Sequence, residues 1–457
     1  MNPKATVILA VILIALGAYI YRYESEPVET DTESSYEKIF DFEAEQIQQI
    51  EVRREENEDV KLERTGEDAW RLLAPIEVDA DGVASDALVN AAASLERERV
   101  VAEGELNLAD FGLDAPQLEL ELTVKDASQP TTLLFGDETP TGSNLYATLA
   151  GGNQVFVMAG SSKYALEKSG WDLRDKRVLR FNRDGVKTVV VKLPEKQFTL
   201  ARVSVDFWNV AEPVLTRADR YKASGLVSML ESTKMQELVT ESAGDVSQYA
   251  QYGLDSPTYQ VEIQLADGSS DTLLLGDQQG TNYYARNPDR PLVYLIAESA
   301  VNDIKRDETE YISKRLFAFA TYQASKLQIA SADEATRVYE KVKEDDGDVW
   351  KQTAPEAEDM EGTMVDDLLY KLNGTDAAEM LPEGPSLETP RYAITVWSKE
   401  SENSEELAVG DTTGDTVYAR RDGDDLTLKI SPESWKEIEA LMRLDETTDD
   451  ESGGVSP

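Results

Sequence analysis

Three aspartates, each directly after a glycine, are the residues whose type and spacing best suit cation binding or catalysis. Asp137, Asp277 and Asp411 stand in LLFGD, LLLGD and LAVGD, each at the end of an apolar stretch. A carboxylate there could bind a cation or exchange protons. More often it accepts backbone N–H groups in the turn that follows a strand. We therefore expect a structural turn at all three sites, with cation binding as the first alternative and catalysis as the last.

Three tryptophans recur, each with a proline five residues later: Trp70, Trp208 and Trp350. Exposed tryptophan rings can line a groove for a carbohydrate or a peptide, whereas buried ones anchor a small core. Each of these tryptophans closes a short predicted strand and precedes a predicted helix. We therefore favour the core role and keep a ligand groove as the alternative.

One stretch of this acidic chain is basic, the sequence RDKRVLR at residues 174–180. Its cations are Arg174, Lys176, Arg177 and Arg180. Cations at the end of a helix complement the helix dipole, so a solvated helix end is the simplest interpretation. The alternative is that the segment docks on an acidic partner or on a neighbouring repeat of the same chain.

The residue types that are missing limit the chemistry further. The 457 residues include no cysteine and no histidine, which excludes disulfides, thiolate nucleophiles, a Ser-His-Asp triad and the usual zinc and haem sites. There are 45 Lys and Arg against 89 Asp and Glu, a formal charge of −44, and such a field repels nucleic acid. We expect no cofactor, no nucleic-acid partner and no enzymatic activity.

The elements that position these residues recur in the same order three times. After each tryptophan comes an i, i+4 apolar stripe, which indicates an amphipathic helix. A Gly-Leu-Asp-x-Pro turn follows at Gly112 and Gly253 and, in the altered form SLETP, at Ser386. Alternating apolar residues on either side indicate half-buried antiparallel strands. An acidic residue is expected at or near the N-cap of each amphipathic helix, at Asp81, Asp219 and Glu361.

This recurrence predicts an α+β fold of three tandem repeats, each with the order β-β-α-β-β-β-β-α and a mostly antiparallel sheet. The predicted bounds of the repeats are 36–182, 183–320 and a diverged third at 321–446. The helix that closes each repeat is expected near residues 160–174, 297–313 and 431–443.

The N-terminal segment predicts a membrane anchor. Residues 5–21 carry no charge and follow Lys4, and this length is near the minimum for a spanning helix. Positive charge at the N-terminus places that end in the cytoplasm and the remainder outside it. We expect an anchor over 1–23, an acidic linker over 24–35 and a disordered acidic tail over 447–457. A cleaved signal peptide is the alternative to an anchor.

The chain resembles a bacterial family known as domain of unknown function 4340. The resemblance rests on the N-terminal anchor and on WRLLAPIEVDADGVASDALVNAAASL, FGLDAP, LLFGDETPTGSNLYA and GWDLRDKRVLRF, and it is closest over the first repeat. The family has no established catalytic residues, and its members often accompany components of ABC-type transporters. The resemblance therefore implies an accessory role in the periplasm, on the bacterial inner membrane, with a membrane or envelope protein as partner.

These observations favour a non-catalytic scaffold or binding module of a transporter or envelope complex. One alternative is a glycan- or peptide-binding protein that uses the clefts between repeats. Another is a carboxylate-dependent hydrolase of envelope polymers, which would need two carboxylates about 5–10 Å apart across a cleft.

Overall fold

The computed structural model describes residues 36–443 except 56, 68, 141, 206, 242–247, 345–346, 360–362, 399–403 and 414–415. The predicted anchor, linker and C-terminal tail lie outside the described residues, as does Glu361. Within the described part, no helix is long and apolar enough to cross a membrane.

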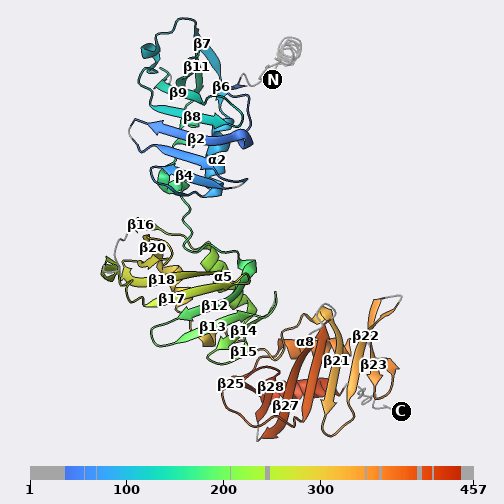
Figure 1. The fold of residues 1–457 in the computed structure, drawn as a ribbon. Coiled ribbons are helices and arrows are strands. Elements are labelled where there is room, and N and C mark those ends of the chain that lie inside the picture. The colour runs from blue at the N-terminus through green and yellow to red at the C-terminus, as the bar shows by residue number, and fades with distance from the viewer. Residues whose placement is uncertain are drawn as a thin grey trace, which may run out of the picture. The chain divides into compact units, whose positions relative to one another are not determined.

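Three nine-stranded antiparallel sheets dominate the described chain (Figure 1). The first has the strand order β5-β4-β3-β2-β8-β9-β10-β11-β7. Its strands are β2 (Ile47–Arg54), β3 (Val60–Arg64), β4 (Trp70–Ala74), β5 (Val78–Asp79), β7 (Arg99–Glu103), β8 (Leu118–Val124), β9 (Thr131–Glu138), β10 (Asn144–Leu149) and β11 (Gln154–Ala159). Two-residue strands β1 (Glu37–Lys38) and β6 (Glu96–Arg97) form a small separate sheet.

The second and third sheets repeat this order, as β15-β14-β13-β12-β17-β18-β19-β20-β16 and β24-β23-β22-β21-β26-β27-β28-β29-β25. The second consists of β12 (Val186–Lys192), β13 (Gln197–Arg202), β14 (Trp208–Glu212), β15 (Thr216–Arg217), β16 (Glu237–Thr240), β17 (Tyr259–Leu265), β18 (Ser270–Gln279), β19 (Asn282–Arg286) and β20 (Val293–Ala297). The third consists of β21 (Ala324–Ser331), β22 (Arg337–Glu344), β23 (Gly347–Ala354), β24 (Glu358–Asp359), β25 (Glu379–Leu381), β26 (Tyr392–Ser398), β27 (Ser404–Thr413), β28 (Thr416–Arg421) and β29 (Thr427–Ile430).

Eight helices accompany the sheets in the described chain. They are α2 (Gly82–Ala93), α3 (Ser161–Leu166), α4 (Gly170–Leu173), α5 (Arg220–Ser232), α6 (Glu298–Ile304), α7 (Glu308–Tyr311), α8 (Met364–Gly374) and α9 (Pro432–Met442). Alternation in the strands creates the apolar face that these helices cover. In β8, for example, Leu118, Leu120 and Leu122 are fully buried, since every second side chain points to one face.

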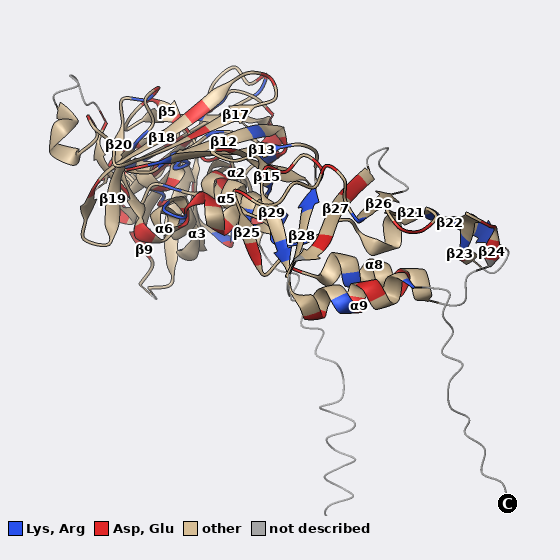
Figure 2. Cartoon of the chain, turned by 90° about the horizontal axis from the view of Figure 1, so that it is seen from below, with Lys and Arg blue, Asp and Glu red and all other residues tan. Residues whose placement is uncertain are grey.

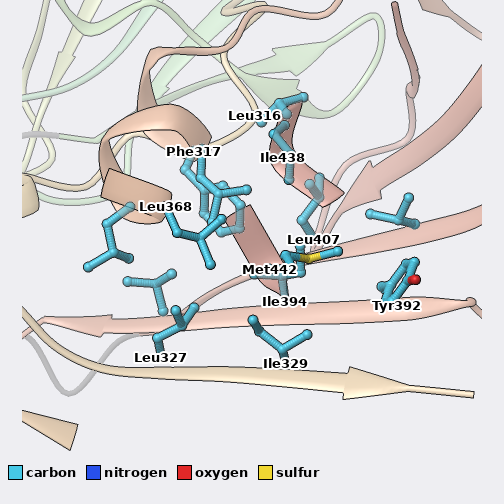
Figure 3. Close-up of a cluster of buried hydrophobic side chains, with 14 of the residues drawn as sticks. Leu316, Phe317, Leu327, Ile329, Leu368, Tyr392, Ile394, Leu407, Ile438 and Met442 are labelled. Atoms are coloured by element: carbon cyan, nitrogen blue, oxygen red, sulfur yellow. The ribbon is translucent and has the colours of Figure 1, made fainter. Parts of the chain in front are cut away.

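The third sheet shows how each core is built. Side chains of α8 and α9, including Leu368 and Ile438, meet Leu327 of β21, Ile394 of β26 and Leu407 of β27 in one buried cluster (Figure 3). The helices therefore cover one face of the sheet, which is the layer arrangement of an α+β domain. Basic and acidic residues are both spread over strands and helices (Figure 2).

The predicted fold class, α+β with mostly antiparallel sheets, is confirmed, but the strand count is higher than expected. The tryptophans lie in strands of their own: Trp70 and Trp208 begin β4 and β14, and Trp350 lies inside β23. A further strand follows the helix and pairs with the last strand of the sheet. The predicted single closing helix is two short helices in the first two cases, α3 with α4 and α6 with α7. New N-caps at Ser169 and Asp307 start the second helix of each pair.

The chain divides into two compact units, residues 1–176 and 177–457. The first unit contains the first sheet, and the second unit contains the other two. The division falls inside the basic stretch 174–180.

Candidate functional site

The three tryptophans are core residues in this structure. Trp70, Trp208 and Trp350 are at most 4% exposed. A cation from the preceding strand lies over each ring, with Arg64, Arg202 and Lys341 between 4.2 and 5.2 Å from the ring centroid. None of the three rings therefore presents an open face to a ligand. The peptide bond before the proline that follows each tryptophan is cis, at Pro75, Pro213 and Pro355.

The indole N–H groups distinguish the second sheet from the other two. Trp70 Nε1 donates to Asp86 Oδ1 at 2.8 Å, and Trp350 Nε1 donates to Asp366 Oδ1 at 2.9 Å. Both acids lie 16 residues after their tryptophan, on the helix that covers the sheet. The second sheet has Ser224 at that position, and among the described residues Trp208 Nε1 has no hydrogen-bond partner.

The Gly-Leu-Asp-x-Pro turn and the Gly-Asp pair, distant in sequence, meet in space. Gly112 has a left-handed φ of 64° and ends the 3₁₀ helix Leu108–Phe111. A Cβ on Gly112 would lie 2.5 Å from the carboxylate of Asp137. Gly253, with a φ of 66°, has the same relation to Asp277, at 2.6 Å. Both positions require glycine for two reasons: any other residue would be strained at this φ, and its Cβ would clash with the aspartate carboxylate.

The third sheet departs from this arrangement. Ser386 replaces the glycine and does not have a positive φ, because left-handed backbone is unfavourable for a residue with a side chain. No 3₁₀ helix lies directly before Ser386 in the described residues, unlike Gly112 and Gly253. Asp411 is exposed, as are Asp137 and Asp277. The three aspartates lie on different sheets, and no group of three acidic residues in the described chain could hold a metal ion.

The cations of the basic stretch are divided between the two units. Arg174 is buried, and its guanidinium carbon lies 5.4 Å from the Trp171 ring centroid; Lys176 Nζ lies 5.1 Å from the same centroid. Arg177 and Arg180 belong to the second unit and are exposed. Backbone groups of residues 178 and 180 bind the second sheet.

Those backbone contacts recur at the start of the third sheet. Val178 N donates to Thr233 O, and Leu316 N donates to Thr375 O. Two residues further on, Arg180 N donates to the carboxylate of Asp271 at 2.6 Å. In the third sheet, Ala318 N donates to Glu405 at 3.0 Å. An acid at the start of β18 or β27 thus binds the chain segment that enters each sheet.

The second and third sheets are joined by a buried polar cluster. Arg421 is 2% exposed; its Nε donates to Asp424 at 2.6 Å and its Nη1 to the backbone oxygens of Ser313 and Arg315 at 3.0 and 2.7 Å. Its Nη2 donates to Thr216 Oγ1 at 3.1 Å. Burial lowers the pKa of the Arg421 guanidinium, and the carboxylate of Asp424 opposes that shift.

A second contact beside it is an ion pair across the same junction. Arg217 Nη2 lies 2.8 Å from Glu405 Oε2, and both side chains are 13% exposed. The backbone N–H of Arg217 also donates to Asp424 Oδ1 at 3.0 Å. Buried charges remain charged only where paired and hydrogen-bonded in this way. The junction is therefore a specific interface within the second unit.

Sequence reasoning did not find Arg421, Asp424 or the Trp-to-Asp contacts. The shared 16-residue spacing from tryptophan to aspartate was a usable signal for the latter. Arg421 and Thr216 are 205 residues apart, and no local sequence pattern predicts a contact over such a separation.

The fold and these contacts define an α+β protein whose described part contains three successive antiparallel sheets covered by helices. A family model described as a domain of unknown function (DUF4340) matches residues 70–206 and 208–386, which is more than half of the chain. The chain therefore belongs to this family, as the sequence motifs predicted. Both matches begin at a tryptophan of the recurring set, Trp70 and Trp208. No curated protein and no solved structure gives a significant match.

Proposed function

We propose that this chain is a non-catalytic scaffold or binding module, made of three tandem copies of one α+β unit and anchored outside the cytoplasm. In this proposal its partner is a membrane or envelope protein, such as a transporter component. The localisation rests on the apolar stretch at residues 5–21 and the basic residue before it. The three-copy organisation is supported by three sheets of identical strand order.

One observation carries the non-catalytic part of the proposal: the recurring residues are used in internal contacts. The tryptophans are buried, and two of them bind an aspartate of their own helix. Asp137 and Asp277 lie against a left-handed glycine. Residues held in common by the copies thus maintain the fold, which leaves the partner-specific surfaces to residues that differ between copies.

The two alternatives have weaker support. A glycan or peptide groove lined by the recurring tryptophans would need rings that are exposed, and these are buried. A carboxylate-dependent hydrolase would need two acids across one cleft, whereas Asp137, Asp277 and Asp411 lie on different sheets.

The test is crosslinking of the full-length, tagged chain in its native membrane, followed by detergent extraction and quantification of co-purified proteins. We expect one membrane or envelope protein in near-stoichiometric yield. The matched variant carries Asp137→Asn, Asp277→Asn and Asp411→Asn and should recover the same partner in the same yield. Failure to recover any partner would contradict the scaffold, and loss of cellular function in the folded triple variant would favour catalysis or cation binding.

A further inference from the structure

Two buried N–H donors on neighbouring residues of the second sheet have no acceptor among the described residues. One is Nε1 of Trp208, which is 1% exposed. The other is Nε of Arg202, the cross-strand neighbour of Trp208, whose guanidinium carbon lies 5.1 Å from the centroid of the indole ring. A buried donor without an acceptor costs free energy, so folded proteins almost always supply one.

The positive charge of Arg202 is not balanced by an acid in the described part of the chain. Its Nη1 donates to the backbone oxygens of Arg183 and Asp184 at 3.1 and 3.0 Å, and its guanidinium lies over the Trp208 ring. None of these partners is a carboxylate. Because Arg202 is half-buried, water solvates this cation only in part, and an anion beside it would form a charge-assisted hydrogen bond.

In the third sheet an aspartate serves the equivalent two donors. Lys341 is the cross-strand neighbour of Trp350, as Arg202 is of Trp208. Asp366 Oδ1 accepts the indole N–H of Trp350 at 2.9 Å and lies 3.8 Å from Lys341 Nζ. One carboxylate oxygen therefore lies within reach of both the indole N–H and the cation, which places the two donors around a common point.

The first sheet reaches the same result with one difference. Asp86 accepts the indole N–H of Trp70, and the cation at the register position of Arg202 is Arg64, whose Nε donates to Ile47 O at 3.1 Å. Only the second sheet thus leaves both donors without an acceptor in the described residues.

Ser224 stands where the other two sheets have the aspartate. A serine hydroxyl lies closer to its helix than an aspartate carboxylate would, and it carries no charge. Ser224 is half-buried, and the side chain of Asp366 at the equivalent position is 34% exposed. The place of the carboxylate therefore borders on solvent, and an anion from solution can reach it.

We propose that the second sheet binds the carboxylate group of a small molecule between Trp208, Arg202 and Ser224. The ligand's carboxylate takes the position that the side chains of Asp86 and Asp366 hold in the other two sheets. One of its oxygens accepts the indole N–H, and the guanidinium of Arg202 supplies the opposite charge. This site is independent of the scaffold proposal, because its occupancy is measured on the purified chain without a partner protein.

The test uses the full chain, purified in detergent, with ¹⁵N in the indole groups of its six tryptophans. Single Trp→Phe variants assign the N–H resonances of Trp70, Trp208 and Trp350. Sodium formate or sodium acetate then replaces sodium chloride at constant ionic strength, and acetamide is the uncharged control. We expect at least one carboxylate to move the Trp208 resonance downfield and saturably, without an effect of acetamide. The Trp70 and Trp350 resonances should stay in place, because aspartates already bind these groups.

Arg202→Gln should weaken binding of that carboxylate about tenfold, as expected for the loss of a hydrogen bond between two charged groups. The matched control is Arg64→Gln, at the same register position of the first sheet, which should leave binding at Trp208 unchanged.

Exchanging serine and aspartate between the sheets gives a second, independent measurement. Ser224→Asp supplies a tethered carboxylate, so the Trp208 resonance should move downfield without added anion and should no longer respond to formate or acetate. Asp366→Ser should make the Trp350 resonance responsive instead. In each variant, the unchanged resonances of the other tryptophans show that the chain is folded.

The proposal is overturned if neither formate nor acetate moves the Trp208 resonance, because the acceptor of the indole N–H is then water. It is also overturned if acetamide acts as strongly as the carboxylates, if Arg202→Gln and Arg64→Gln have the same effect, or if the folded Ser224→Asp variant still responds to added carboxylate.

Discussion

Replacing Asp86 by alanine should destabilise the first sheet, whereas replacing Ser224 by alanine should leave the second nearly unaffected. The two residues occupy the same position on equivalent helices, 16 residues after Trp70 and Trp208. Asp86 accepts a 2.8 Å hydrogen bond from a tryptophan that is 3% exposed. Its removal leaves a buried N–H donor without a partner.

A hydrogen bond to a charged group contributes about 1.5–3 kcal/mol, and an unsatisfied buried donor costs a similar amount. We therefore expect Asp86→Ala to lower the free energy of unfolding of the first sheet by about 2 kcal/mol. Ser224 has no such bond to lose, so the effect of Ser224→Ala should stay within about 0.5 kcal/mol.

Native-state hydrogen exchange of the full chain resolves the sheets separately, because amides of each core report the opening of their own cooperative unit. In Asp86→Ala, the most protected amides of β2 and β8 should exchange roughly 30-fold faster. Those of β12 and β17 should not change in either variant. Equal effects of the two substitutions on their own sheets would refute the reasoning, because the Trp70 hydrogen bond would then contribute nothing measurable.

Three further predictions concern other contacts. Gly112→Ala should lower the free energy of unfolding by about 1–3 kcal/mol, because Gly112 has a left-handed φ and a carboxylate beside it. Gly225→Ala, within α5 and with open space around it, should raise that free energy by about 0.5–1 kcal/mol. Urea melts of both variants measure these changes. Arg421→Met should lower the free energy of unfolding by about 3–5 kcal/mol, because it leaves the carboxylate of Asp424 buried without its cation. Unchanged hydrogen-exchange protection of the amides in β21 and β26 would contradict this. Burial raises the pKa of Tyr311 to about 12, so the unfolded phenol, with a pKa near 10, ionises first and stability should fall between about pH 10 and 12 by roughly 2 kcal/mol; Tyr311→Phe should reduce this fall, and an identical pH profile for the variant would count against it.

The sequence predicted the strands whose patterns are local. Alternation identified β8 to β11 and their counterparts, and the acids six residues after the proline were correctly placed as helix caps at Asp81 and Asp219. The additional strand after the helix was missed in all three copies. β16 and β25 have only four and three residues, too few for a periodic pattern to be recognised, and the five residues of β7 do not alternate between buried and exposed.

The polar contacts were beyond local reasoning for a different reason. Arg421 meets Thr216 and Ser313 only after two sheets have formed and docked. An arginine at the end of a strand is ordinarily solvated, so its type alone gives no sign of burial. The basic stretch was interpreted only through its side chains, whereas the backbone N–H groups of Val178 and Arg180 bind the second sheet.

The short outer strands have a consequence for how such a chain can associate. β5, β15 and β24 contain two residues each. At that border of each nine-stranded sheet, the outermost strand therefore exposes very few backbone N–H and C=O groups for pairing with another strand. A chain with three similar sheets is otherwise at risk of joining them edge to edge, within one molecule or between molecules. Short border strands disfavour such edge-to-edge association, and they also give an extended peptide almost no strand with which to pair. These borders therefore favour contacts through side chains over the pairing of strands.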